Sequence, residues 1–130
     1  MNKGDIYSVK IPSVGGHEQA GLRPAIIVQE TGFDKLPTVL IVPLTSKLKA
    51  SDFPLTFMIE PDGKNNLKVS SVALVFQLRA IDKSRLKTKI GRLDPPRLKL
   101  LNASLIKMMS LDSLAYTKFY AFEPFIIWID

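Results

Sequence analysis

Five stretches rich in apolar and β-branched residues, separated by clusters of Gly, Pro, Asn and Ser, dominate the first two thirds of the chain. Two of these stretches are almost uninterrupted apolar runs, the pattern of strands that are buried on both faces. The dense turn signal from Pro61 to Asn66 separates the last two stretches. The pattern predicts strands over Asp5 to Ile11, Arg23 to Gln29, Thr38 to Leu44, Leu55 to Glu60 and Val69 to Ala80.

The last third of the chain changes to a three- and four-residue apolar spacing, which is typical of a helix. Asp94 followed by Pro95 is a helix start, with Asp at the cap and Pro in the first turn. Just before it, Asp82 can cap a single turn over residues 83–85, and Leu86 to Ile90 fits a short strand. The helix should bury one apolar stripe in the core: Leu98, Leu101, Leu105, Met108 and Met109.

The final stretch, Tyr116 to Asp130, holds six of the eleven aromatic residues of the chain. A disordered tail would be polar and poor in aromatic residues. We therefore expect two parts, a domain over residues 1–115 and an aromatic extension over residues 116–130 that packs on the same domain or across a dimer. An exposed anchor for a partner protein is the alternative interpretation.

Composition narrows the class of partner. The 130 residues suit one domain, and the net charge of +6 with a pI near 9.7 favours a polyanionic partner, nucleic acid or an acidic peptide. The charge is uneven, because six basic residues and only one acid lie between Arg79 and Arg92. A solvated edge without any partner would give the same pattern.

Several function classes are excluded or disfavoured. The chain has no cysteine, so disulfides and Cys-based metal sites are ruled out, and its single histidine argues against a His-based metal site. No signal peptide is recognisable at the N-terminus, and no apolar run approaches the roughly 20 residues of a membrane-spanning helix. We expect a soluble cytoplasmic protein without metal, cofactor or membrane partner.

The chemically richest segment is the loop Gly15-Gly16-His17-Glu18-Gln19-Ala20-Gly21-Leu22-Arg23-Pro24. A loop rich in Gly can bring backbone N–H groups close to a ligand. Arg23 would stand at the start of a strand with the rigid Pro24 behind it, and a guanidinium offers a planar fork that suits phosphate. A hairpin loop with a surface arginine is the simpler alternative.

Five short motifs, in this order along the sequence, resemble the MazF/PemK family of toxin endoribonucleases from Gly4 to about Leu111. They are Gly4-Asp5-Ile6-Tyr7, the loop ending in Gly21-Leu22-Arg23-Pro24, Val42-Pro43-Leu44-Thr45-Ser46, the segment Gln77 to Leu86, and Lys89-Ile90-Gly91 with Leu93. The resemblance implies a mainly β (α+β) fold, a small, strongly curved antiparallel sheet of SH3-like barrel character with a C-terminal helix.

The same resemblance implies an activity and its partners. It predicts the toxin of a toxin–antitoxin system, a metal-independent, sequence-selective endoribonuclease that cuts single-stranded mRNA and inhibits translation. The products would carry a 2′,3′-cyclic phosphate and a 5′-hydroxyl. The partners would be RNA, a second copy of the chain in a homodimer, and an acidic antitoxin protein.

Two other functions compete with this one. A gyrase poison of the CcdB type shares the fold and has an aromatic C-terminus, which Trp128-Ile129-Asp130 faintly resembles. The Gly-rich loop with Arg23 argues against it, because a protein that only binds has no use for a phosphate site. A degenerate toxin fold that serves as a binding module is the third possibility.

Three residues are candidates for catalysis. Arg23 matches the catalytic arginine of the family and Thr45 its catalytic threonine, although Thr at a strand end more often caps the backbone. His17 has a side chain suited to proton transfer near neutral pH. In family members with this histidine, the resemblance implies an Arg and an Asp as companions, and this sequence has Leu74 and Phe76 in their places. The role of His17 is therefore in doubt.

A second group of residues is expected to bind RNA: Glu18, Gln19, Ser46, Gln77 and Arg79. The amide of Gln77 can donate and accept at once, which suits base recognition. Arg79, two residues further along the same strand, would face the same side and contact phosphate. Phe53 and Phe57 could stack on bases, with core packing as the alternative for each.

Overall fold

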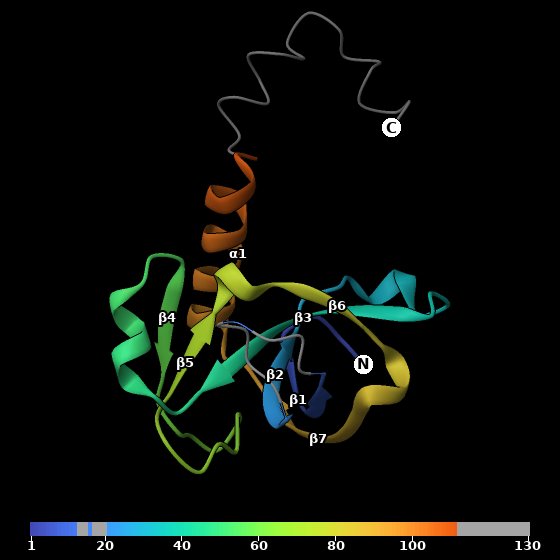
Figure 1. Ribbon diagram of the computed structural model, residues 1–130, viewed down its shortest axis with the longest axis horizontal. Coiled ribbons are helices and arrows are strands. Elements are labelled where there is room, and N and C mark those ends of the chain that lie inside the picture. Colours follow the sequence, from blue (N-terminus) through green and yellow to red (C-terminus); the bar gives the residue numbers. More distant parts are fainter. Residues whose placement is uncertain (13–15, 17–20, 112–130) are drawn as a thin grey trace, which may run out of the picture.

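The computed structural model describes residues 1–12, 16 and 21–111, which form seven strands, four short 3₁₀ turns and one helix (Figure 1). The strands are β1 (Asp5–Ile11), β2 (Gly21–Ile27), β3 (Thr38–Thr45), β4 (Thr56–Ile59), β5 (Ser71–Leu74), β6 (Arg79–Asp82) and β7 (Leu86–Arg92). The 3₁₀ turns are η1 (Thr31–Phe33), η2 (Leu48–Asp52), η3 (Val75–Gln77) and η4 (Lys83–Arg85), and the helix is α1 (Pro95–Met109). The predictions for the first four strands, the turn after Asp82 and the helix are confirmed to within two residues at most ends.

β3 is the central strand of the sheet. The described strands follow the order β4-β5-β3-β2-β1-β7, and β6 also pairs with β3. All pairings among the described strands are antiparallel, as expected for this fold class. β4 and β7 lie at the two ends of the order and do not pair with each other. The described sheet is therefore strongly curved but does not close into a complete barrel.

The single strand predicted over Val69 to Ala80 is wrong. Leu44 of β3 pairs with Ala73 and Ile41 pairs with Arg79, so three steps along β3 correspond to six along the partner segment. The three additional residues form the turn η3, and they divide the segment into β5 and β6, both of which follow the same edge of β3. A continuous apolar run cannot reveal this break, because strand and turn residues here are equally apolar.

The two faces of the sheet carry separate cores. One face packs against α1 around Ile26, Val42, Leu44 and Leu101, and the other buries Ala25, Ile27, Val39 and Ile41. Residues that alternate along β2 and β3 therefore point into different cores. This explains why both strands are apolar at nearly every position, as the sequence predicted.

The helix begins as expected. The carboxylate of Asp94 accepts a hydrogen bond of 2.9 Å from the backbone N–H of Arg97, which caps the first turn. Leu101 is fully buried, and three further members of the stripe (Leu98, Leu105 and Met108) pack partly buried against the core. Met109 is 46% exposed, so its assignment to the buried stripe is wrong. It lies in the last turn of α1, where the helix extends past the sheet in Figure 1.

Two of the sequence motifs contain residues that stabilise the fold. Asp5 is buried and lies 3.4 Å from the ammonium group of Lys89, which links β1 to β7. Gly91 is approached so closely by the carbonyl oxygen of Lys64 that an added Cβ would lie 2.4 Å from it. Any other residue at position 91 would have to displace backbone, which accounts for a glycine in the middle of β7.

The basic run from Arg79 to Arg92 is also partly structural. Besides the ion pair of Lys89, the ammonium group of Lys83 donates to the carbonyl oxygen of Asp34, and that of Lys87 donates to the carbonyl oxygen of Ser84 at 3.3 Å. The run therefore supplies tertiary links as well as positive charge.

Candidate active site

Thr45 ends β3 at the point where the sheet changes partner, from β6 and β2 to β5. Its side chain is almost fully buried, at 2% exposure, and its Oγ1 accepts a hydrogen bond of 3.2 Å from the backbone N–H of Lys47. The oxygen thus serves as a local backbone acceptor, as the simpler interpretation expected. Because a hydroxyl donates as well as accepts, its proton is still available to another acceptor.

Arg23 is the third residue of β2 and is partly buried. β2 and β3 pair from Ile27 with Ile41 to Ala25 with Pro43, and Arg23 and Thr45 each lie two residues beyond this last pair on their own strand. Both candidate catalytic residues therefore lie near the same end of the paired segment, where they alternate with the buried residues Ala25 and Ile41.

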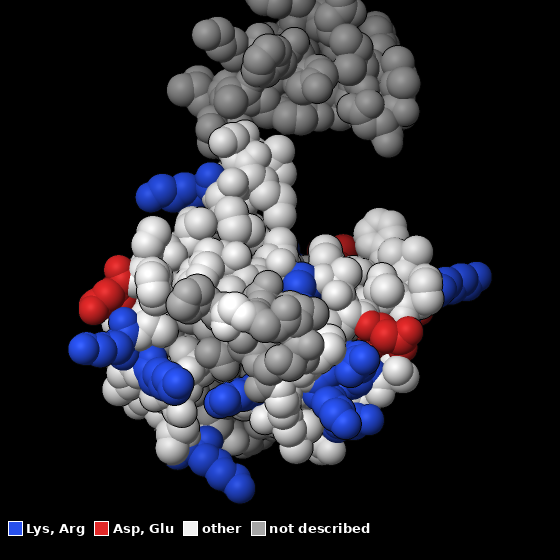
Figure 2. Space-filling view, in the orientation of Figure 1, with Lys and Arg blue, Asp and Glu red and all other residues white. Residues whose placement is uncertain are grey.

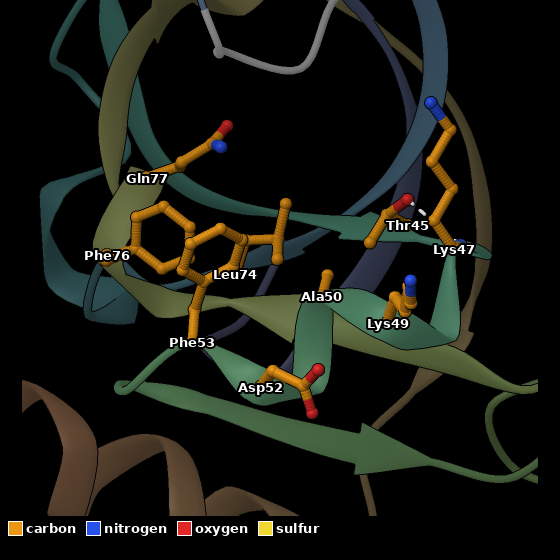
Figure 3. A pocket seen from close by; sticks show the side chains of 9 residues that line it. All are labelled: Thr45, Lys47, Lys49, Ala50, Asp52, Phe53, Leu74, Phe76 and Gln77. Atoms are coloured by element: carbon orange, nitrogen blue, oxygen red, sulfur yellow. Dashed lines mark hydrogen bonds between the residues drawn. The ribbon is translucent and has the colours of Figure 1, made fainter.

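A pocket of about 680 Å³ opens beside Thr45 (Figure 3). Its size lies within the range of sites for small ligands, roughly 300–1,000 Å³. In Figure 3 the amide of Gln77 extends toward the cavity from one side and Thr45 with Lys47 stands on the other. The lining consists of Thr45, Lys47, Lys49, Ala50, Asp52, Phe53, Leu74, Phe76 and Gln77.

Two exposed aromatic rings form one wall of this pocket. Phe53 follows η2 and Phe76 lies in η3, and their ring centroids are 5.5 Å apart with the planes tilted by 53°. They are 59% and 40% exposed, unusual values for large apolar side chains that already touch one another. Phe57, the other stacking candidate, is 8% exposed and belongs to the core, so the core alternative holds for it.

The expected RNA-binding residues separate in the structure. Gln77 lines the pocket, whereas Arg79 does not, because η3 interrupts the strand that was expected to carry both. Arg79 pairs with Ile41, and its Nη1 is buried without a hydrogen-bond partner in the described part of the chain. Ser46 is exposed and is not among the lining residues. His17, Glu18 and Gln19 lie outside the described residues.

The positions expected for the companions of His17 are occupied by apolar pocket walls. Leu74 is buried at the base of the pocket and Phe76 forms part of its side. Neither side chain can exchange a proton or carry charge. The site therefore has an apolar surface where the resemblance implies polar groups.

Sequence reasoning missed the lysines and Phe76. Lys47 and Lys49 follow directly after Thr45 and bring two cations to the pocket, a signal that the sequence does contain. The role of Phe76 could not be found from sequence, because it depends on the unforeseen turn η3. On the face seen in Figure 2, Lys and Arg gather over the lower half and acidic side chains lie at the margins.

The described ranges contain neither a metal-binding cluster nor a membrane-spanning helix. Within residues 1–12, 16 and 21–111, no group of three or more His, Cys, Asp or Glu side chains could hold a metal ion. Over the same ranges, no helix has the length and apolar character needed to cross a membrane.

Comparison with known proteins gives consistent matches over most of the chain. The family described as PemK-like, MazF-like toxin of type II toxin–antitoxin system matches residues 2–109. The chain is 34% identical over 115 residues to a protein named endoribonuclease MazF from Staphylococcus saprophyticus subsp. saprophyticus, which covers 88% of this chain and 95% of that relative.

Two solved structures resemble the fold of this chain. Crystalline MazF (Form-I) from Deinococcus radiodurans has a TM-score of 0.71 at 23% identity, covering 85% of this chain and 96% of that one. An endoribonuclease in complex with its cognate antitoxin from Mycobacterial species has a TM-score of 0.67 at 18% identity, covering 86% and 97%. At these identities the two structures show a shared fold.

Proposed function

This chain belongs to the PemK-like, MazF-like toxins of type II toxin–antitoxin systems, and we propose that it cuts single-stranded mRNA at selected sequences and thereby stops translation. The relative from Staphylococcus saprophyticus subsp. saprophyticus carries the name endoribonuclease. The observation that carries the proposal is the pocket that Thr45, Lys47 and Lys49 line, at the end of the paired segment of β2 and β3 beyond which Arg23 also lies.

The proposed reaction uses the RNA's own 2′-hydroxyl as nucleophile. The O2′–P bond forms and the P–O5′ bond breaks, leaving a 2′,3′-cyclic phosphate and a 5′-hydroxyl, while the proton of the 2′-hydroxyl is removed and the leaving O5′ gains one. Arg23 would bind the non-bridging oxygens, where negative charge grows in the transition state. Thr45 would donate its hydroxyl proton to the same phosphate, since its oxygen is already engaged by the N–H of Lys47.

Removal of the proton from the 2′-hydroxyl requires a group other than Arg23, because a guanidinium has too high a pKa to exchange protons readily. His17 is the one histidine of the chain and the candidate for that role. Its expected companions are replaced by Leu74 and Phe76, which cannot orient or charge an imidazole. We therefore assign His17 a minor part and expect positioning and charge stabilisation to supply most of the rate.

RNA would extend from the scissile phosphate along the basic surface. Arg79 is proposed for this path because it opens the basic run from Arg79 to Arg92 and a guanidinium suits backbone phosphate. Arg79 pairs with Ile41, four residues before Thr45 on β3, which is roughly 13 Å along a strand. It would thus bind a phosphate other than the scissile one. Gln77, Ser46, and Glu18 and Gln19, which lie outside the described residues, are the further RNA contacts that we propose.

We also propose a homodimer and an acidic antitoxin as partners. The Mycobacterial endoribonuclease to which the chain is similar is described in complex with its cognate antitoxin. A two-fold dimer would join two basic surfaces into one groove, which RNA or an acidic antitoxin segment could occupy but not share. Sedimentation at micromolar concentration should give a dimer, and a monomer alone would contradict this arrangement.

Incubation with a long single-stranded RNA in EDTA tests the function most directly. Cutting at a limited set of sequences, with 2′,3′-cyclic phosphate on the 3′ ends of the fragments, supports the proposal. Intact RNA together with trapped gyrase–DNA complexes would indicate a gyrase poison instead. Intact RNA without any such complex would indicate a binding module.

A further inference from the structure

Phe53 and Phe76 are the feature of the pocket that the proposed chemistry does not use. They come from positions more than twenty residues apart in the chain, yet their rings meet at 5.5 Å and remain 59% and 40% exposed. Leaving two large aromatic faces in water forgoes the stabilisation that burial would give. An exposed apolar surface within a polar rim is typical of a binding site.

The backbone holds both rings in place. The N–H of Phe53 donates to the carbonyl oxygen of Ala50 at 3.1 Å, and the N–H of Leu78 donates to the carbonyl oxygen of Val75 at 3.0 Å. These bonds close the two turns η2 and η3 from which the rings project. A wall that is fixed before the ligand arrives costs less to order on binding.

We propose that Phe53 and Phe76 form a stacking wall for one unpaired nucleobase of the RNA, next to the scissile phosphate at Thr45. This inference rests on the proposed endoribonuclease function and adds to it a pair of specificity-determining residues. Aromatic side chains are the usual stacking partners of unpaired bases, and apolar Leu74 and Ala50 complete the same pocket. Purines are favoured over pyrimidines, because their larger ring system covers more of the wall.

The polar groups of the pocket fit the rest of a nucleotide. Lys47 and Lys49 stand on the side of the cavity away from the two rings in Figure 3, where they can meet the phosphates that flank the base. The amide of Gln77 extends into the cavity and can contact the edge of the stacked base. An acidic peptide would suit the lysines but would bring no aromatic face to the wall, so RNA is the favoured occupant.

The first test compares cleavage by four variants of the full chain. Phe53→Ala and Phe76→Ala remove the wall, Phe76→Tyr keeps a ring, and Phe33→Ala removes an exposed phenylalanine that does not line the pocket. After the cut sites are mapped on a long RNA, kcat/KM is measured on short RNAs that differ only at the positions next to the cut. Each alanine variant should lose about 5- to 150-fold and should lose base preference at one position. Phe76→Tyr should keep that base preference because it keeps a ring, and Phe33→Ala should stay near wild type.

The second test measures stacking without cleavage. An RNA with 2′-deoxyribose at the cut and 2-aminopurine beside it should be quenched on binding to the wild type and to Phe33→Ala, and less so with either alanine variant. Thermal melting of each variant checks that it is folded. Unchanged base preference and unchanged quenching in folded Phe53→Ala and Phe76→Ala would overturn the inference, as would loss of antitoxin binding with RNA cutting intact. A wild-type protein that cuts no RNA would instead overturn the proposed function.

Discussion

Two apolar hollows border β3, and they differ in the chemistry that surrounds them. The candidate active-site pocket at the end of β3 offers a hydroxyl, an amide, a carboxylate and two ammonium groups around its apolar wall. The second hollow, which we call the helix groove, has about half the volume, at about 340 Å³ against about 680 Å³. Its lining is Lys3, Val28, Leu40, Leu78, Asn102, Leu105, Ile106, Met109 and Leu111.

Exposed apolar surface in a small domain can bind a ligand or pack against more protein, and the two hollows differ in which of these they favour. In the pocket, apolar side chains stand among groups that can bind and react, which favours a ligand. In the helix groove, apolar side chains dominate the lining and only Lys3 and Asn102 are polar, which favours packing against more protein. The chain also leaves the described part of the structure at Leu111, on the border of the groove.

The strongest test of the pocket is Arg23→Ala. It removes the cation that lies at the same end of β2 and β3 as Thr45, and it should lower the cleavage rate by about 10²–10³, the usual cost of losing one charged or hydrogen-bonding transition-state contact. Single-turnover cleavage of a long RNA measures the effect. Arg92→Ala is the matched control, because it removes the same charge from an exposed position on β7. Equal rates for wild type and folded Arg23→Ala would refute the site.

Thr45→Val should reduce cleavage less, by about tenfold to a hundredfold, or roughly 1.4–2.7 kcal/mol of transition-state stabilisation. The exchange removes the hydroxyl and keeps a β-branched side chain at a buried position. Thr45→Ser keeps the hydroxyl and should retain most activity. If valine and serine variants cut RNA equally well, the hydroxyl would serve only the backbone bond from Lys47.

The helix groove is tested by a chain that ends at Ser113. We propose that residues 116–130, with their six aromatic side chains, pack over the groove of the same domain. The shortened chain should melt several degrees lower or aggregate, since a loss of about 1 kcal/mol moves the melting temperature of a domain of this size by roughly 2–8 °C. An equally stable dimer that has lost only a partner would show that the segment is an anchor.

A substitution in the groove sharpens this test. Ile106→Ser should lower the melting temperature of the full chain, because it removes apolar surface that the segment would cover. In the chain that ends at Ser113 the same change should have little effect, because the segment that would cover Ile106 is gone. Equal losses in both chains would exclude contact between Ile106 and residues 116–130.

The smallest effect is expected for His17→Ala, less than about threefold in cleavage rate, because its usual companions are replaced by Leu74 and Phe76. Rates between pH 5 and 8 measured on wild type and variant check this. A loss as large as that for Arg23→Ala would make His17 the main proton-transfer group.

Local patterns in the sequence were sufficient wherever a short segment decides its own structure. Asp94 and Pro95 mark the helix start because the cap bond lies within four residues, and the apolar runs mark β2 and β3 because both faces of these strands are buried. The motif order also predicted Arg23 and Thr45 as site residues.

Only the tertiary structure decided the shape of the site. The antiparallel pairing of β2 with β3 brings Arg23 and Thr45 to the same end of these strands. The three-residue excess of η3 between β5 and β6 moves Phe76 and Gln77 out of the sheet and into the pocket. Register and bulges depend on which partner edge a strand finds, and that choice is made by residues distant in sequence. The candidate reactive residues are therefore recognisable from short sequence motifs. The surface that would select the RNA depends on strand pairings between distant segments, which no short motif predicts.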